Sequence, residues 1–127
     1  MALFEALRRY LHADPAVSLA VAFGSVAKGD QGPDSDIDLG IRFDSDDRVE
    51  RIEIELGRST RRRVDVVLLD EAPPLLRFEI AKDGIVLVER EKHAWADFRA
   101  RAMLDWWDWA PVARTIEDGL IAGLGER

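Results

Sequence analysis

The sequence predicts an α/β fold in which a small mixed β-sheet is flanked by helices. Four short runs are rich in apolar and β-branched residues, as strands are, and the segments around them repeat apolar residues at helical spacing. The chain has 127 residues, which is enough for one hydrophobic core but too few for two. We therefore expect one domain over residues 1–127, with C-terminal helices from about residue 92.

Composition narrows the class of protein. Apolar residues make up 47% and charged residues 34% of the chain, as in an ordinary soluble globular domain. The chain has no cysteine, so disulfides and thiolate zinc sites are excluded and a cytoplasmic setting is expected. No run approaches the ~20 apolar residues of a membrane span, and the N-terminus lacks the apolar centre of a signal peptide. We expect no contact with a membrane.

The net charge of −7 indicates which kinds of molecule the protein can bind. Proteins that bind long nucleic acids usually carry an excess of basic residues. An acidic chain instead favours a small nucleotide that arrives with its metal, or a basic protein partner. We therefore expect no direct contact with nucleic acid.

The N-terminal segment predicts an amphipathic helix that ends at or before Pro15. Its apolar residues share one face: Leu3, Phe4, Leu7, Tyr10 and Leu11. Residues 17–23 are nearly continuously apolar and predict a central strand.

Beyond that strand, Gly24 breaks the pattern and residues 25–28 can begin a short helix. A loop over residues 29–35, rich in Gly, Pro and Asp, leads to a second strand at residues 37–43.

The following segment has two possible structures. Ser45 is a plausible N-cap for a helix over residues 46–56, and Gly57 suits the C-terminus of that helix or a turn. Residues 52–56 also alternate apolar and acidic residues, as a strand would. The residues alone leave both interpretations open.

Two more strands are expected at residues 63–69 and 85–89, on either side of a helix over residues 74–82. Pro73-Pro74 marks the start of this helix, and Asp83-Gly84 predicts a turn after it.

A longer helix is expected at residues 92–109, and Pro111 should separate it from a last helix at residues 112–122. One stripe of the longer helix is apolar and should contact the sheet; it contains Trp95, Phe98, Ala102, Trp106 and Trp109. Three apolar residues lie off this stripe: Met103, Leu104 and Trp107. These three residues either form part of a partner surface or are covered by the last helix.

The stretch from Phe23 to Ile41 carries the chemistry. Because alternate side chains of a strand share a face, Asp36 and Asp38 point the same way. Two such carboxylates repel each other unless a cation lies between them, and oxygen-only ligands suit Mg²⁺ or Mn²⁺. Upstream, the Gly24-Ser25 turn offers backbone N–H groups to an anion at the point where a strand meets a helix.

Gly24-Ser25, ten intervening residues and then Asp36-x-Asp38 resemble the signature of the polymerase-beta-type nucleotidyltransferases. The chain is most similar to the minimal nucleotidyltransferase (MNT) group, which occurs as antitoxins beside HEPN-domain toxins. This resemblance spans roughly the whole chain. It implies the nucleotidyltransferase fold, and it favours the helix over the strand at residues 46–56.

The resemblance also implies roles for single residues. Asp65 would be the third carboxylate, so that Asp36, Asp38 and Asp65 would form the catalytic and metal-binding set. Gly24 and Ser25 would hold the β- and γ-phosphates of the nucleotide, and Lys28 would either neutralise phosphate charge or be an ordinary solvated lysine.

Alternatives remain for other polar residues. Asp65 could instead pair with one of Arg61 to Arg63, and these arginines could contact phosphate or simply be solvated. His12 and His93 lie in predicted helices without ligand spacing around them, so we expect no metal role for either.

The function implied by the resemblance is transfer of AMP from ATP to a tyrosine of a cognate HEPN ribonuclease, which silences that toxin. Two other functions remain open, namely neutralisation of a toxin by binding alone and nucleotidyl transfer to a small molecule. About 35 residues follow the fourth strand, too few for an added acceptor-binding domain. The acceptor should therefore arrive on another protein, or the site should be completed in a homo- or hetero-oligomer.

Overall fold

A four-stranded mixed sheet forms the centre of the molecule, as expected. The computed structural model describes residues 2–29, 32, 35–44 and 48–125, with the side chains of residues 112–113 and 117–125 excepted. The strands are β1 (Val17–Phe23), β2 (Ile37–Phe43), β3 (Val64–Leu68) and β4 (Ile85–Glu89), in the order β3-β2-β1-β4. Strand β1 is antiparallel to β2 and β4, while β2 and β3 are parallel. The mixed sheet of the predicted fold class is confirmed.

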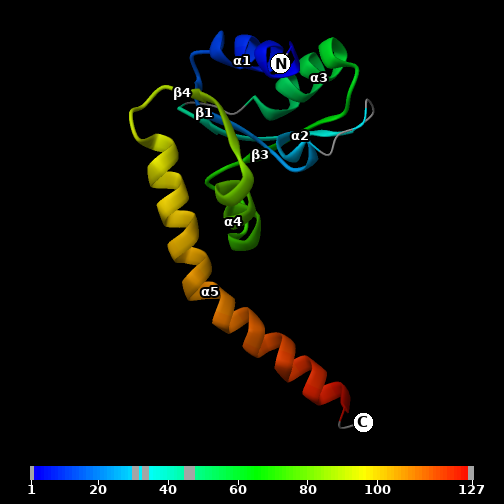
Figure 1. Cartoon of the computed structure of the whole chain (residues 1–127), viewed down its shortest axis with the longest axis vertical. Helices are drawn as coiled ribbons and strands as arrows, with labels where there is room; N and C mark the ends of the chain where they lie inside the picture. The colour runs from blue at the N-terminus through cyan, green and yellow to red at the C-terminus, as the bar shows by residue number, and fades with distance from the viewer. Residues whose placement is uncertain (1, 30–31, 33–34, 45–47, 126–127) are drawn as a thin grey trace.

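Helices cover the two faces of this sheet (Figure 1). Helices α1 (Ala2–His12) and α3 (Val49–Thr60) lie on one face, and α4 (Pro74–Asp83) and α5 (Ala94–Gly125) lie on the other. The short helix α2 (Ser25–Lys28) follows β1 directly. We call these sides the α1/α3 face and the α4/α5 face.

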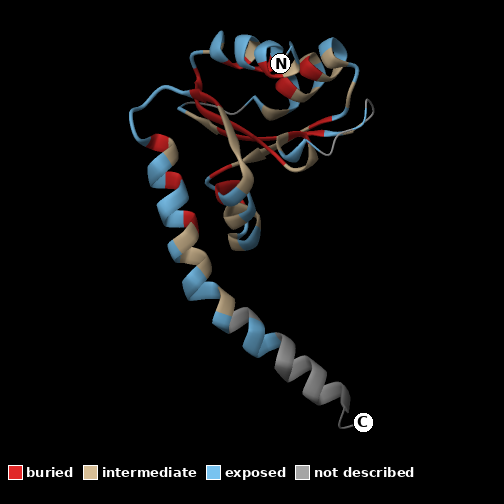
Figure 2. Ribbon diagram, in the orientation of Figure 1, coloured by how far each residue is buried: buried red, intermediate tan, exposed pale blue. Residues whose placement is uncertain are grey.

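Alternation along the strands divides the core into two parts (Figure 2). On the α1/α3 face, Ile37, Leu39 and Ile41 of β2 pack with Leu7 and Leu56 from the two helices. The α4/α5 face has its own apolar cluster, which contains Leu19, Val21, Leu69, Ile80 and Phe98. Because β1 contributes buried residues to both clusters, all seven of its residues are buried, which confirms it as a central strand.

Helix α3 confirms the helical interpretation of residues 52–56 but not the predicted end of that helix. Gly57 lies inside the helix, which continues to Thr60. Arg61 follows in a left-handed conformation with φ of 57°, so it serves as the terminating residue that Gly57 was expected to be. The proposed N-cap Ser45 lies outside the described residues.

Helix α5 differs most from expectation. It begins at Ala94 rather than at residue 92, so His93 precedes it, and it continues through Pro111 to Gly125. Proline removes one backbone donor, which would bond to the carbonyl of Trp107. Because the Trp107 side chain is 65% exposed, water can reach this part of the helix and solvate that carbonyl, so the helix need not end.

The packing of α5 also differs from the prediction. The first half of α5 lies mainly against α4, where Trp106 stacks on Phe78 with ring centroids 5.4 Å apart. Phe98 and Ala102 are buried, whereas Trp109 is 38% exposed because α5 extends beyond α4 (Figure 1). The predicted contact of Trp109 with the sheet is therefore wrong. Within the described residues, no helix is both long enough and apolar enough to cross a membrane.

Candidate active site

The turn from β1 into α2 has a backbone that only glycine adopts without strain. Gly24 has φ of 71° and ψ of −152°, a region that residues with a Cβ rarely occupy. A Cβ added at Gly24 would lie 2.5 Å from Oδ2 of Asp38. Gly24 is thus required twice, for the conformation of the turn and for the close approach of the Asp38 carboxylate.

The sheet brings two of the predicted carboxylates together. Strands β2 and β3 are parallel in a register that places Asp38 opposite Asp65, so both side chains lie on the α4/α5 face. On the other side of β2, Asp38 is opposite Phe23, the last residue of β1. This pairing places Asp38 beside the Gly24 turn.

The electrostatics of Asp38 reflect this crowding. Its pKa is raised above the ordinary aspartate value, first by burial and then by the negative charges of Asp65 and Asp36. Both of the other predicted carboxylates therefore act on Asp38 at the start of β2 and β3. A divalent cation would relieve both the repulsion and the desolvation.

Asp65 has a cation beside it already. Nε of Arg63 lies 3.2 Å from Oδ1 of Asp65, which is the pairing left open as an alternative role for Asp65. A neighbouring contact fixes the strand itself, because the carboxylate of Glu53 in α3 accepts the N–H of Val66 at 2.9 Å. Strand β3 is an edge strand, so this contact satisfies one donor on its outer side.

Lys28 also has a partner. Its Nζ lies 3.6 Å from Oδ2 of Asp83 at the end of α4, and the lysine side chain is 53% exposed. In this conformation Lys28 is a half-exposed member of an ion pair, and its role toward phosphate stays a prediction. Ser25 begins α2 directly after Gly24, and its role toward phosphate likewise stays a prediction.

The donor set suits a hard divalent cation, because it consists of carboxylate oxygens alone. Across the part of the chain that the structure describes, however, no three His, Asp or Glu side chains are gathered closely enough to hold a metal ion. The strand register already places Asp38 opposite Asp65. Binding of a metal ion would therefore require only that the carboxylate side chains rotate and that Arg63 releases Asp65. The metal role of Asp36, Asp38 and Asp65 remains a prediction.

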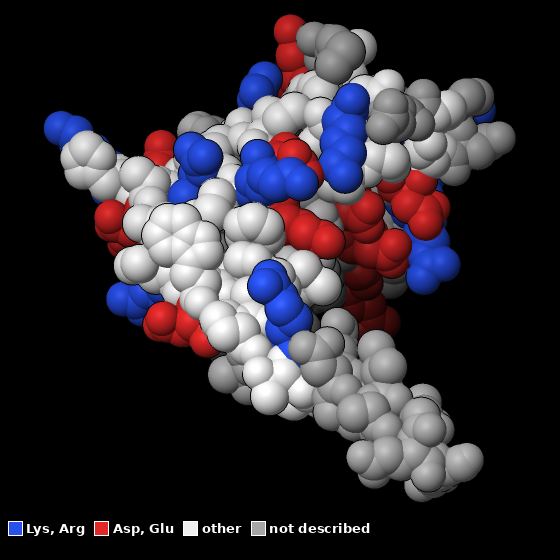
Figure 3. Space-filling view, turned by 60° about the horizontal axis from the view of Figure 1, so that its bottom comes forward, with Lys and Arg blue, Asp and Glu red and all other residues white. Residues whose placement is uncertain are grey.

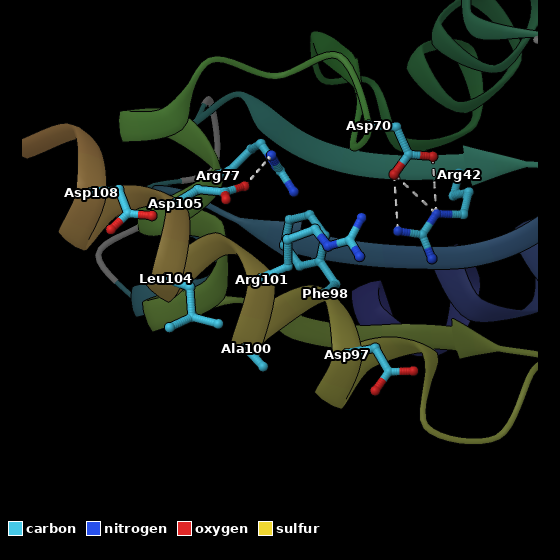
Figure 4. Close-up of a pocket in the computed structure, with 10 residues that line it drawn as sticks. All are labelled: Arg42, Asp70, Arg77, Asp97, Phe98, Ala100, Arg101, Leu104, Asp105 and Asp108. Carbon is cyan, nitrogen blue, oxygen red and sulfur yellow. Dashed lines mark hydrogen bonds and ion pairs between the residues drawn. The ribbon is translucent and has the colours of Figure 1, made fainter.

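A cavity of about 1040 Å³ lies on the same α4/α5 face but away from the carboxylates. Residues from the end of β2, the end of β3, α4 and α5 line it (Figure 4). Arg42 of β2 forms a bidentate pair with Asp70, and Arg77 of α4 pairs with Asp105 of α5 at 3.0 Å. Arg42 is four residues along β2 from Asp38, which is about 13 Å in a strand.

These pairs give the cavity a different character from the carboxylate site, because its guanidinium and carboxylate groups largely neutralise each other. Acidic side chains gather near the middle of this side of the molecule, with basic side chains beside them (Figure 3). The carboxylates at the start of β2 and β3, rather than this cavity, form the candidate active site.

The off-stripe residues of α5 are exposed in part. Leu104 is 58% and Trp107 65% exposed, whereas Met103 packs against the core of the α4/α5 face. Because α5 continues in one direction through Pro111, no separate last helix covers Leu104 and Trp107. These two residues are available to a partner.

Several polar contacts of the structure were not predicted. Each of them joins elements that are distant in sequence. Glu53 accepts the backbone N–H of Val66, Asp83 forms an ion pair with Lys28, and Asp70 forms one with Arg42. The sequence gives no motif for such pairs, since they depend on how the elements pack. Within the described residues, neither histidine belongs to a metal-binding group.

Comparison with known proteins agrees with this geometry. The model of the polymerase beta nucleotidyltransferase family matches residues 5–93, which contain the four strands, the Gly24 turn and all three carboxylates. The chain belongs to the polymerase beta nucleotidyltransferase family. No curated protein sequence matches this member of the family.

Solved structures share the fold of this nucleotidyltransferase. One is a toxin–antitoxin complex with AMP-PNP, with TM-score 0.77, 20% identity and coverage of 94% of this chain and 97% of that chain. Another contains a tri-AMPylated HEPN toxin of Shewanella oneidensis with an MNT antitoxin, at TM-score 0.77, 17% identity and the same coverages. A third is the MntA–HepT toxin–antitoxin, with TM-score 0.76 and 17% identity over 94% of this chain and 97% of that chain. At these identities the similarity shows the fold.

Proposed function

We propose that this chain is a metal-dependent nucleotidyltransferase that transfers AMP from ATP to a tyrosine hydroxyl of a cognate HEPN toxin and so acts as its antitoxin. The observation that carries the proposal is the register of β2 and β3, which sets Asp38 opposite Asp65 next to the Gly24 turn. The family membership supports the reaction class. The antitoxin complexes that share the fold, one with an AMPylated HEPN toxin and one with AMP-PNP, support the acceptor and the nucleotide.

In the proposed reaction, the acceptor oxygen attacks the α-phosphorus of ATP in line with the departing pyrophosphate. An oxygen–phosphorus bond forms to the α-phosphorus, the bond from the α-phosphorus to the bridging oxygen breaks, and pyrophosphate leaves with the bonding electron pair. Asp65 accepts the proton of the acceptor hydroxyl, as a general base within reach of the site.

Binding of the triphosphate falls to the β1–α2 turn. Backbone N–H groups after Gly24 and the hydroxyl of Ser25 would donate to the β- and γ-phosphates, and the absence of a Cβ at Gly24 lets them approach. Lys28 would exchange Asp83 for phosphate, because a dianionic group attracts an ammonium more strongly than one carboxylate does.

Asp36, Asp38 and Asp65 would hold the divalent ion, Mg²⁺ or Mn²⁺. When bound, such an ion neutralises charge on the α-phosphate and lowers the pKa of the attacking hydroxyl. The raised pKa of Asp38 supports this assignment, since carboxylates crowded in this way are stabilised by a cation between them.

The test is to co-express the chain with the product of the neighbouring gene and to measure the intact mass of that partner. We expect increments of one or more AMP units, which Asp38→Asn should abolish. The matched control is Glu50→Gln, because Glu50 is an exposed carboxylate in the first turn of α3. This variant removes the same charge away from the site and should leave the increments unchanged. A partner that stays unmodified with the wild-type chain would contradict the proposal.

A second candidate function is neutralisation by binding alone. It is favoured by the exposure of Leu104 and Trp107 on α5, because large apolar side chains are common anchors of protein interfaces. Under this alternative, Asp38→Asn would neutralise the partner as well as the wild type does, whereas Trp107→Ala would not.

A further inference from the structure

Arg63 occupies a position in the sheet that places it within the carboxylate site. The N–H of Ile37 donates to the carbonyl of Arg63 at 2.8 Å, which is the ladder bond by which Ile37 pairs with Val64. Asp36 directly precedes Ile37, and Arg63 directly precedes its partner Val64. The two strands therefore bring Asp36 and Arg63 to the same end of the sheet as the facing pair Asp38 and Asp65.

The side chain of Arg63 points to the same side as these carboxylates. Residues 63 and 65 share a face because side chains alternate along an extended strand, and the contact of 3.2 Å between Nε of Arg63 and Oδ1 of Asp65 bears this out. The pair is open to solvent, with side-chain exposures of 74% for Arg63 and 38% for Asp65. Arg63 can consequently move away without leaving a buried charge.

Lys28, the other basic residue predicted at this site, is engaged elsewhere, since it pairs with Asp83 of α4. In the metal-free protein Arg63 thus pairs with the charge of Asp65, while burial, Asp65 and Asp36 still raise the pKa of Asp38. A divalent ion and the guanidinium of Arg63 would compete for the same oxygen of Asp65.

We propose that Arg63 is a built-in counter-ion of the active site, which holds Asp65 in the metal-free protein and is displaced when the divalent metal binds. Arg63 is a positioning residue in this account: it lowers the affinity for metal and holds the side chain of Asp65 until the metal arrives. The inference rests on the proposed function, because it requires a metal at Asp38 and Asp65.

The test measures Mn²⁺ affinity by calorimetry on the full chain without nucleotide or partner. Removal of a competing exposed ion pair should tighten binding, so we expect the dissociation constant of Arg63→Gln to fall by about two- to fivefold. The conservative variant Arg63→Lys keeps the charge and should stay near the wild-type value. Because exposed ion pairs are screened by salt, the difference between wild type and Arg63→Gln should shrink at 1 M KCl, roughly ten times the ionic strength at which the Debye length is about 10 Å.

A thermal unfolding measurement distinguishes this role from a merely structural one. Arg63→Gln should lower the melting temperature in EDTA but not in saturating Mn²⁺, because the metal then replaces the missing positive charge. The matched control is Arg51→Gln, which breaks a similarly exposed Arg–carboxylate pair with Glu55 on α3. That control should leave the Mn²⁺ affinity unchanged.

The outcomes separate the two proposals. Wild-type binding that Asp38→Asn abolishes, together with an Arg63→Gln affinity equal to or weaker than wild type, would overturn the role of Arg63 alone. Wild-type binding that Asp38→Asn does not affect, or no binding at all, would overturn the metal site and the role of Arg63 with it.

Discussion

The two faces of the sheet are built from the same strands but have different roles. On the α1/α3 face, β2 presents Ile37, Leu39 and Ile41, all fully buried beneath two helices. On the α4/α5 face, the intervening positions of β2 are Asp38, Gly40 and Arg42. Only the middle one is covered: a Cβ at Gly40 would lie 2.6 Å from Cδ2 of Leu69 and 3.7 Å from Cδ1 of Ile80.

The difference teaches how a chain of this size can hold a polar site without losing its core. One face supplies a continuous apolar core, and the other is closed only at its centre, so that both ends of β2 remain polar. The end with Asp38 carries the candidate active site, and the end with Arg42 carries the neutralised cavity. Adjacent residues of β2 should therefore respond to mutation in opposite ways.

Leu39→Ala should give the largest loss of stability. Leu39 is fully buried on the α1/α3 face, and truncation of such a leucine costs about 2–5 kcal/mol because it leaves a cavity. Urea unfolding monitored by tryptophan fluorescence would measure the change. A loss of less than about 0.5 kcal/mol in the free energy of unfolding is typical of surface substitutions. Such a small loss in Leu39→Ala would show that the α1/α3 face is not the main core.

Asp38→Asn, one residue earlier, should instead stabilise the metal-free protein at pH 7, by at most about 1 kcal/mol because Asp38 is only partly buried and solvent screens its repulsion. The pKa of Asp38 is raised by burial and by Asp65 and Asp36, so ionisation of this acid costs the folded state free energy that the unfolded state does not lose. The cost is absent below the unfolded pKa of about 3.9 and develops as the pH rises through the raised folded value.

The increase in the free energy of unfolding caused by Asp38→Asn should accordingly disappear at about pH 3, below the pKa of aspartate in the unfolded chain. Urea unfolding at pH 7 and at pH 3 measures this difference. Glu50→Gln serves as the control for loss of one negative charge. A destabilised Asp38→Asn protein at pH 7 would mean that the carboxylate makes a favourable contact in the fold rather than an unfavourable one.

The smallest effect concerns the rim of the α1/α3 face, where Tyr10 of α1 donates to the carboxylate of Glu55 in α3. Burial, this hydrogen bond and the charge of Glu55 together raise the pKa of Tyr10 to about 12. Because Tyr10 is the one tyrosine of the chain, a spectrophotometric titration reports it alone. We expect a midpoint of about 12 and a lower midpoint in Glu55→Gln. A wild-type midpoint at the ordinary tyrosine value of about 10 would show that the contact does not persist in solution.

Local patterns were sufficient to predict most of the fold. Strands β1, β2 and β4 begin and end where apolar runs meet Gly, Pro or charged residues, and their bounds match the expected ranges. Spacing also placed Gly24, Asp36 and Asp38 at one junction. The contribution of Asp65 could not be obtained from spacing, because it depends on the parallel pairing of β3 with β2, and only the family resemblance pointed to it.

The errors arose where context outweighs local preference. Gly57 and Pro111 are both residues that commonly end helices, yet α3 and α5 continue through them. Trp109 continues the apolar stripe of α5 but is 38% exposed, and the pattern alone could not show that it lies outside the core. The partner of Lys28 likewise depended on which charged residue the packing brought near it, whereas the pairing of Asp65 with Arg63 was among the alternatives that the sequence offered.

The most direct measurement is a crystal structure of the chain with Mn²⁺ and AMP-PNP, with the metal located by its anomalous scattering. The account predicts a metal between Asp38 and Asp65 at oxygen distances near the ~2.1 Å of Mg²⁺ sites, Arg63 turned away from Asp65, and the triphosphate over Gly24 and Ser25. A metal bound elsewhere, or a nucleotide seated in the cavity beside Arg42 with the carboxylates unchanged, would contradict it.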